Sequence, residues 1–233
     1  MRLDLSILNK GIVATRSQGS DLIRRGKVLV NGKIVTKCGY EVLESDEIAI
    51  DEVVNYFSRG YKKLEGAVQD FGISFGNKTV LDVGSSTGGF TYYALTHGAQ
   101  KVICYDTGKD QMHPSIRNDE RVELHEETNI LSTKDIQVDI VLIDVSFVSV
   151  LPILKHVISF GQQILFLIKP QFEIGKQHIK NGIVKDKNLI DSILLSIQEE
   201  ITLLGSKIHY LKPCHIKGKG GNNEFFCLID GKA

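Results

Sequence analysis

The stretch Val80-Leu-Asp-Val-Gly-Ser-Ser-Thr-Gly-Gly-Phe90 decides the fold of this chain. Residues 79–83, at its start, are apolar and β-branched, which predicts a buried strand. A turn rich in glycine and hydroxyl residues follows, and we expect a helix from residue 89 onward. Ligands of parallel α/β sheets bind at junctions of this kind, beyond the carboxyl end of a strand. The stretch therefore predicts a ligand-binding turn after the first parallel strand.

The residues of this turn favour a cofactor that carries no phosphates. Gly84 permits a sharp turn and leaves room for a ligand. Ser86 breaks the G-x-G-x-x-G fingerprint of dinucleotide sites at its third position. Asp82, just before the glycine, suggests that the ligand places a positive charge nearby. S-adenosylmethionine satisfies both conditions, and an ordinary turn without a ligand is the alternative.

A second acid extends the predicted cofactor site. Asp106 ends a second strand, residues 101–105, and an acid about 20 residues past the glycine turn commonly holds a ribose hydroxyl pair. A solvated loop aspartate is the alternative. Asn129 is assigned to the adenine, although a loop cap explains it equally well. The expected cofactor contacts are Asp82, Gly84, Ser85, Ser86, Thr87, Gly88, Gly89, Phe90, Asp106 and Asn129.

Charge is distributed unevenly along a chain whose net charge is zero. A neutral total disfavours nucleic-acid binding, but residues 1–40 hold eight lysines and arginines against two aspartates, and acids gather in residues 41–52. A basic module on a near-neutral body suits contact with RNA phosphates. The candidate RNA-binding residues are Arg2, Arg16, Arg24, Arg25, Lys27 and Lys33.

The length of 233 residues allows a domain with a small appendage. Residues 1–50 predict the appendage, with helices over residues 5–12 and from residue 15 or 17 to residue 25. A hairpin is expected around Asn31-Gly32, between strands 28–30 and 33–35. Residues 51–60 are predicted to be a linker, and residues 61–233 the main domain.

Strands and helices alternate in the main domain, which predicts an α/β fold with a doubly wound, mostly parallel Rossmann-like sheet beside a small α+β RNA-binding domain. The expected strands are 79–83, 101–105, 121–125, 138–143 and 163–168, and the expected helices lie near 61–70, 89–97, 147–157 and 187–203. Strands 207–212 and 224–230 have no helix between them and are expected to form an antiparallel hairpin at the sheet edge.

Several features indicate a cytoplasmic protein. The four cysteines include no C-x-x-C pair and suit reduced thiols. No signal peptide opens the chain, and no apolar run approaches the ~20 residues that span a bilayer. The seven histidines show no ligand spacing, so we expect no metal.

Four charged residues stand at predicted element ends. Asp144 and Lys169 each follow a strand, Glu224 opens the last strand, and Lys63 lies in the helix that enters the domain. Because the carboxyl ends of parallel strands meet at one edge, we expect these side chains to share a cleft, where half-buried charges need partners. For any single lysine, a solvated surface position is the alternative.

The chain resembles a known family in its motifs. The matching segments run in order from end to end: Arg2-Leu-Asp4, Ser58-Arg-Gly60 with Lys63-Leu64, Asp82-Val-Gly-Ser-Ser-Thr-Gly-Gly-Phe90, Asp119 to Val122, Asp144-Val-Ser-Phe147, Lys169-Pro-Gln-Phe-Glu173 and Gly221-Asn-Asn-Glu-Phe225. The body resembles FtsJ-type RNA 2′-O-methyltransferases. The whole chain resembles the TlyA-type, haemolysin-like family, which adds an RNA-binding domain like that of ribosomal protein S four.

This resemblance implies methyl transfer from S-adenosylmethionine to a ribose 2′-hydroxyl of RNA, and ribosomal RNA is the expected substrate. It implies a catalytic tetrad of Lys63, Asp144, Lys169 and Glu224. Lys169 would be the base that removes the hydroxyl proton, Lys63 the second cation, and the two acids would hold both lysines. The chain departs from the family pattern at Tyr61 and at Lys109-Asp110, where glycine is usual.

Two other functions remain open from the sequence. An RNA-binding protein that kept the fold but lost catalysis is compatible with the departures. A haemolysin that acts on membranes is suggested by the family label, but no spanning segment or strongly amphipathic basic helix supports it.

Overall fold

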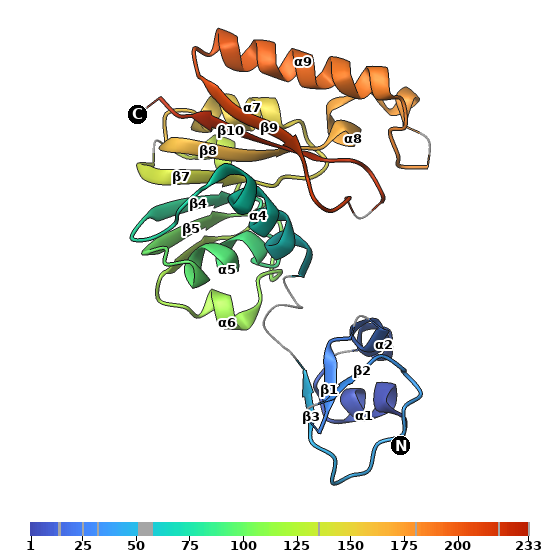
Figure 1. Cartoon of the computed structure of the whole chain (residues 1–233). Helices are drawn as coiled ribbons and strands as arrows, with labels where there is room; N and C mark the ends of the chain where they lie inside the picture. The colour runs from blue at the N-terminus through green and yellow to red at the C-terminus, as the bar shows by residue number, and fades with distance from the viewer. Residues whose placement is uncertain are drawn as a thin grey trace. The chain divides into compact units, whose positions relative to one another are not determined.

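A computed structural model describes residues 1–13, 15–24, 26–31, 33–50, 58–134, 136–179, 181–218 and 220–232. The chain divides into two compact units, Met1–Ser58 and Arg59–Ala233 (Figure 1).

The N-terminal unit packs two helices against a three-stranded antiparallel sheet of order β2-β1-β3. Its elements are α1 (Leu3–Asn9), α2 (Arg16–Arg24), β1 (Val28–Val30), β2 (Lys33–Val35) and β3 (Ile48–Ile50). The predicted hairpin is confirmed, with Val30 opposite Lys33. The first helix ends at Asn9 rather than at residue 12, because the chain turns at Gly11, whose φ is +69°. The small core comprises Leu3, Ile7, Val13, Ile23, Val28, Val30 and Val42.

The larger unit is built on a seven-stranded sheet of order β6-β5-β4-β7-β8-β10-β9. Its strands are β4 (Thr79–Val83), β5 (Lys101–Tyr105), β6 (Val122–His125), β7 (Val138–Ile143), β8 (Gly161–Ile168), β9 (Ile208–Pro213) and β10 (Phe225–Asp230). Strand β10 pairs antiparallel with β8 and β9, and all other adjacent strands are parallel. The mostly parallel sheet and the final antiparallel pair are therefore confirmed. The last strand, β10, lies inside the sheet, and β9 forms the edge.

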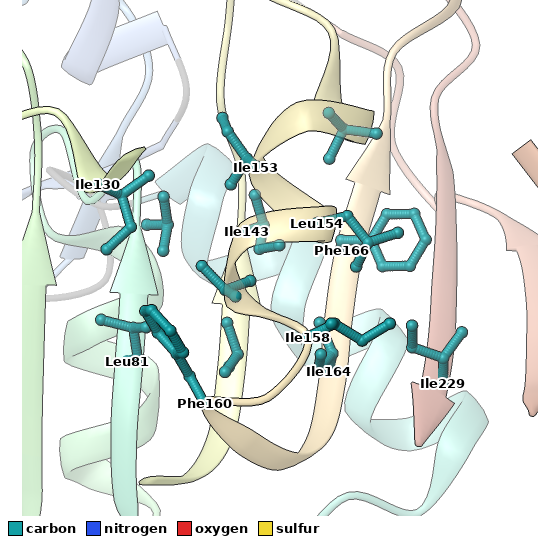
Figure 2. Packing of buried hydrophobic residues seen from close by; sticks show 14 of the residues in the cluster. Leu81, Ile130, Ile143, Ile153, Leu154, Ile158, Phe160, Ile164, Phe166 and Ile229 are labelled. Carbon is teal, nitrogen blue, oxygen red and sulfur yellow. The ribbon is translucent and has the colours of Figure 1, made fainter. Parts of the chain in front are cut away.

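Helices cover both faces of this sheet (Figure 1). They are α4 (Ser58–Phe71), α5 (Gly89–Thr96), α6 (Pro114–Arg117), α7 (Val150–Val157), α8 (Pro170–Glu173) and α9 (Lys187–Leu203), with 3-10 turns η1 (Ile130–Ser132) and η2 (Lys176–His178). On one face, strand residues such as Leu81, Ile143 and Phe166 pack against Ile153 and Leu154 of α7 (Figure 2). This apolar layer between the sheet and α7 fixes the positions of the carboxyl ends of the strands.

Two further boundaries differ from the predicted ones. Residues 58–60, assigned to the linker, form the first turn of α4. There a close backbone contact with α5 leaves only 3.0 Å between a Cβ built on Gly89 and the Gly60 Cα. Residues 51–57 of that linker lie outside the described residues. The helix expected from residue 147 begins at Val150, because Phe147 has a φ of +69° and Ser149 caps the helix.

The strand order reverses at β4, because β5 and β6 extend the sheet on one side of it and β7 and β8 extend it on the other. Open α/β sheets bind ligands at such a switch point, beyond the carboxyl ends of the strands. No helix in the described part of the chain is long and apolar enough to cross a membrane.

Candidate active site

Two clefts open at the carboxyl ends of the parallel strands. We call the first the lysine cleft; it measures about 620 Å³ and includes Lys63, Asp144, Lys169 and Glu224 in its lining. The four predicted catalytic residues therefore meet, although they come from α4, the end of β7, the end of β8 and the approach to β10. The sheet order explains this meeting, because it sets β7, β8 and β10 side by side.

The four side chains form one continuous network of opposite charges. Lys63 Nζ lies 2.7 Å from Glu224 Oε2 and 3.9 Å from Asp144 Oδ2. Lys169 Nζ lies 2.6 Å from Asp144 Oδ1 and donates to Ser146 Oγ at 2.8 Å. Asp144 thus bridges the two lysines and keeps them from repelling each other.

Burial makes these pairs obligatory. Lys63, Lys169 and Glu224 are each less than one-tenth exposed, and a buried charge without a partner is costly. Burial by itself would lower the pKa of Lys63, but the carboxylates of Asp144 and Glu224 outweigh it and raise that pKa above its ordinary value. Lys63 therefore remains a cation, which suits the predicted role of a fixed positive charge.

The second cleft, which we call the Asp106 cleft, measures about 570 Å³ and lies at the ends of β4, β5 and β7. Its described lining holds two carboxylates, Asp106 and Asp144, and no lysine or arginine. Apolar groups such as Ile130, Val145 and Pro152 complete it. This lining suits a ligand with an apolar ring and a positive charge, and it offers no cation to a phosphate.

Asp106 and Asn129, both predicted cofactor contacts, line the Asp106 cleft. The Asp106 carboxylate accepts the backbone N–H groups of Ser86 and Gly108, at 2.8 and 2.7 Å, and so joins the glycine turn to the loop after β5. The Asn129 side chain accepts the N–H of Leu131 at 3.0 Å. Asn129 therefore acts as a loop cap, which is the alternative that the sequence left open. It also borders the Asp106 cleft.

The other predicted contacts in the glycine turn divide into two groups. Those that border a cleft are Gly84, Ser85, Ser86, Thr87, Gly89 and Phe90. Close packing also requires glycine at position 84, because a Cβ there would lie 2.8 Å from the Asp144 carbonyl oxygen. Asp82 and Gly88 line neither of these two clefts.

Asp82 and Gly88 shape the turn from behind. Asp82 is fully buried and accepts a hydrogen bond of 2.6 Å from Thr91 Oγ1 in α5, while its Oδ1 has no partner. Gly88 adopts φ +94°, and a Cβ there would meet Ile116 at 2.8 Å. Both residues fix the start of α5, so the expectation that Asp82 faces a bound cation does not match its position.

Several cleft residues received no role from the sequence: Ser146, Phe147, Gln171 and Asn222. Gln171 donates to Glu224 Oε1 at 3.2 Å, and Asn222 binds the N–H of Val184 at 2.9 Å. All four residues lie in family motifs, namely residues 144–147, 169–173 and 221–225, and these motifs are the sequence signal that could have identified them. Only the tertiary structure shows what each side chain contacts.

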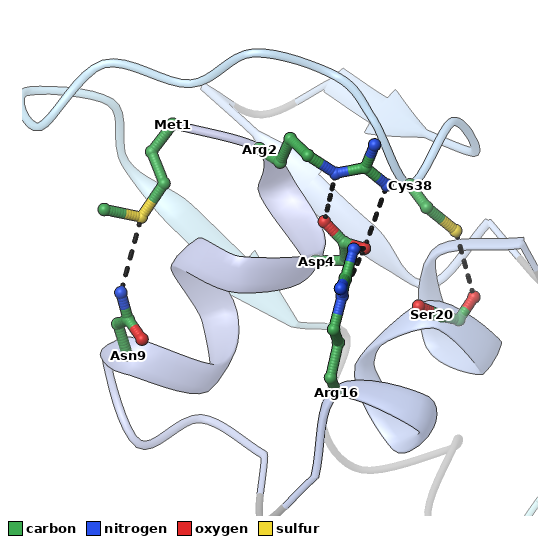
Figure 3. Close-up of polar contacts among 7 residues, drawn as sticks. All are labelled: Met1, Arg2, Asp4, Asn9, Arg16, Ser20 and Cys38. Atoms are coloured by element: carbon green, nitrogen blue, oxygen red, sulfur yellow. Dashed lines mark hydrogen bonds and ion pairs between the residues drawn. The ribbon is translucent and has the colours of Figure 1, made fainter.

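A third hollow, of about 410 Å³, lies within the N-terminal unit and includes Arg2, Arg16 and Arg24 in its lining. Arg2 and Arg16 converge on Asp4, which is 2% exposed (Figure 3). Hydrogen bonds from Arg2, opposed by burial and reinforced by Arg16, lower the Asp4 pKa to about 2. Of the other RNA-binding candidates, Lys27 and Lys33 lie outside this arginine hollow, and Arg25 lies outside the described residues.

Sequence comparison assigns both units. The FtsJ-like methyltransferase profile matches residues 56–230, three quarters of the chain. The chain belongs to the FtsJ-like methyltransferase family. An S4 domain profile matches residues 1–48 of this methyltransferase, which covers the small helix-and-hairpin unit.

Relatives of this FtsJ-like methyltransferase match along nearly its whole length. Hemolysin A of Brachyspira hyodysenteriae is 38% identical over 237 residues, covering 97% of this chain and 98% of the relative. The 16S/23S rRNA (cytidine-2′-O)-methyltransferase TlyA of Mycobacterium tuberculosis is 36% identical, and the match covers 98% of this chain and 89% of that relative. A solved structure of a haemolysin-named protein from Streptococcus thermophilus superposes with a TM-score of 0.75 at 31% identity, covering 99% and 88%. The chain thus belongs to the TlyA and haemolysin A group.

The departures from the family pattern are accommodated in the methyltransferase unit. Tyr61 packs edge-on against Tyr93, with ring centroids 4.9 Å apart. Lys109 pairs with Glu127 at 3.1 Å. Asp110 takes a φ of +52°, the region in which glycine is free of strain. None of the three residues belongs to the network of Lys63, Asp144, Lys169 and Glu224.

Proposed function

We propose that this protein transfers a methyl group from S-adenosylmethionine to the 2′-hydroxyl of a ribose in ribosomal RNA. The observation that carries the proposal is the buried network of Lys63, Asp144, Lys169 and Glu224, set where two clefts meet. One cleft offers the lysines and the other offers carboxylates and apolar groups. Five residues line both clefts: Gly84, Ser86, Asp144, Ser146 and Phe147.

The residues of the Asp106 cleft fit S-adenosylmethionine. When bound, this cofactor supplies an electrophilic methyl group on a positively charged sulfur. Asp106 is positioned to receive ribose hydroxyls, the apolar residues around Ile130 to receive the adenine, and Asp144 to favour the sulfonium charge. No lysine or arginine of the described lining would oppose that charge.

The lysine cleft supplies the acceptor chemistry. A ribose hydroxyl is a weak nucleophile, so its proton must leave as the carbon–oxygen bond forms and the carbon–sulfur bond breaks. Lys169 first gives up its ammonium proton to solvent; its neutral amine, next to Asp144 at the wall shared with the other cleft, then accepts the hydroxyl proton. Lys63 stays charged and, with Asp144 and Glu224, fixes the field around the developing bond. Holding both reactants in line supplies the rest of the acceleration.

The arginine hollow of the N-terminal unit recognises RNA in this scheme. Its arginines reach the surface while Asp4 holds two of them in place, which suits contact with backbone phosphates. The name of the M. tuberculosis relative points to cytidine in ribosomal RNA, and we propose the same target class here. Such a target places the enzyme in the cytoplasm with the ribosomes.

Incubation with radiolabelled S-adenosylmethionine and isolated ribosomal subunits tests the proposal, with Lys63→Ala and Lys169→Ala proteins as controls. We expect label in RNA that survives alkali, because a 2′-O-methyl group blocks cleavage of the next phosphodiester bond. Both variants should lose the signal while retaining the fold. Equal labelling by Lys169→Ala would contradict the chemistry. Tight RNA binding without any methyl transfer would instead support a non-catalytic RNA-binding protein.

A further inference from the structure

The loop between β7 and α7 forms the wall between the two clefts. We call residues 144–149 the partition loop. All six line the Asp106 cleft, and Asp144, Ser146 and Phe147 also line the lysine cleft. A small displacement of this loop would therefore change both clefts at once, including the place where the methyl donor and the hydroxyl must meet.

The conformation of the partition loop is not one that its own sequence favours. Phe147 has a φ of +69°, a region that bulky side chains rarely adopt. Its ring is 88% exposed, so burial of the ring does not stabilise the conformation. A strained, exposed loop persists only where surrounding contacts determine it. Asp144, at the start of the loop, is held by β4 and Lys63, and the contacts of the residues beyond it include several from residues 169–173.

Besides the pairing of Lys169 with Asp144, the segment 169–173 holds the partition loop at three further residues, Ser146, Phe147 and Ser149. Lys169 Nζ donates to Ser146 Oγ at 2.8 Å. The ring of Phe172 lies 5.2 Å, centroid to centroid, from that of Phe147. Glu173 holds the far end of the loop, where its Oε2 accepts from Ser149 Oγ at 2.5 Å and its Oε1 accepts from the Val150 N–H at 2.8 Å.

Of Lys169, Phe172 and Glu173, which hold the loop, only Glu173 borders neither the lysine cleft nor the Asp106 cleft. Its carboxylate binds one side chain of the loop and one N–H at the start of α7. Ser149 already caps that helix through its contact with Leu151, so α7 has a cap of its own. The additional bonds that Glu173 accepts fix the junction of the loop and α7, Ser149 and Val150, against the end of α8.

We propose that Glu173 is a positioning residue that holds the partition loop in the geometry required for methyl transfer. The inference rests on the proposed function. Without the carboxylate, the loop relaxes from the Phe147 conformation, the wall of the Asp106 cleft shifts, and Ser146 no longer meets Lys169 at a fixed distance. Cofactor binding and turnover then fall together, while the RNA contacts of the N-terminal unit are unaffected.

Glu173→Ala and Glu173→Gln, made in the full chain, separate this role from a simple structural one. Glutamine keeps an oxygen that accepts from the Val150 N–H, and its NH2 group can donate to Ser149 Oγ. The kcat and the cofactor Kd of Glu173→Gln should therefore stay within about threefold of wild type. Alanine should lower kcat by about tenfold or more, because small misplacements of reacting groups are costly. It should also weaken the Kd for S-adenosylmethionine, measured calorimetrically, and leave the KM for RNA nearly unchanged. Glu199→Ala, on the exposed face of α9, is the matched control.

The proposal fails if Glu173→Ala lowers only Tm and keeps the wild-type kcat per folded molecule and the wild-type cofactor Kd. It also fails if Glu173→Gln is as impaired as Glu173→Ala. If Glu173→Ala does not fold, Ser149→Ala replaces it in the test. This variant removes one of the two bonds to Glu173, and its cofactor Kd should be weaker than that of wild type. If the wild-type protein transfers no methyl group to RNA, the proposed function is wrong, but the cofactor Kd still tests Glu173.

Discussion

Lys63 Nζ and Glu224 Oε2 lie 2.7 Å apart although 161 residues separate them in the chain. Both side chains are less than one-tenth exposed. The pair joins the helix that enters the methyltransferase unit to the strand that completes its sheet. It is therefore both a part of the proposed catalytic network and a contact on which the fold depends.

Removing one partner should be worse than removing both. Glu224→Ala leaves Lys63 close to Asp144 alone and should cost about 3–5 kcal/mol of unfolding free energy, the usual result for a broken buried ion pair. A Lys63→Met, Glu224→Leu double variant should recover most of that stability and remain inactive. Denaturant unfolding with an activity assay measures both properties. A double variant as unstable as Glu224→Ala would contradict the expectation.

Asp106 should control cofactor binding without affecting RNA binding. Its carboxylate joins Ser86 to Gly108 and borders the Asp106 cleft. Asp106→Ala should weaken the Kd for S-adenosylmethionine by about tenfold or more, since hydrogen bonds to a charged group are each worth ~1.5–3 kcal/mol. Asp106→Asn should be intermediate, because it keeps one acceptor oxygen. An unchanged Kd in the alanine variant, by calorimetry, would place the cofactor elsewhere.

Asp82 should make stability depend on pH. Burial raises its pKa to about 7 from 3.8, against the lowering effect of the Thr91 hydrogen bond. Because the folded pKa is the higher one, the stabilising contribution is complete below pH 3.8 and is lost as the pH rises through 7. Asp82→Asn should thus gain stability over wild type between about pH 4 and 8, by up to about 4 kcal/mol. The measurement is the free energy of unfolding of both proteins at several pH values. If the difference between the two proteins is the same at every pH from about 4 to 8, Asp82 does not titrate in that range.

The arginine hollow should contribute to RNA affinity in a salt-dependent way. Arg24→Ala should weaken binding of ribosomal RNA and lower the slope of log K against log salt by about 0.7–0.9 for each phosphate that the variant no longer neutralises. Arg16→Ala should do the same and also leave Asp4 with one arginine partner fewer. Lys10→Ala, outside the hollow, is the control. Equal slopes for Arg24→Ala and Lys10→Ala would place the RNA elsewhere.

Much of the fold was predictable because its signals are local. The strand at residues 138–143 and the helix at residues 187–203 were placed at their observed limits. Strand β3 was missed, because Ile48-Ala-Ile50 is short and follows a cluster of acids. The start of α4 was misplaced, since only its contact with α5 shows that Gly60 belongs to a packed helix.

The site was predictable to a different extent. The sequence indicated that Asp144 and Lys169, at strand ends that meet at one edge of a parallel sheet, would share a cleft with Lys63 and Glu224. It misjudged Asp82, whose acid-before-glycine position suggested a ligand although the side chain points into the protein and holds Thr91. It assigned no role to Glu173, since a glutamate two residues after a glutamine has no local pattern that marks it as a partner of Ser149.

By itself, the sequence determined the alternation of strands and helices, the glycine turn and the basic character of the N-terminal unit, because periodicity, turn chemistry and charge are written in neighbouring residues. The tertiary structure alone decided which charges pair, which carboxylates line a cleft and how the partition loop is held. Those features depend on distances between segments far apart in the chain, such as Lys63 and Glu224, and only the packing of the sheet and its helices sets those distances.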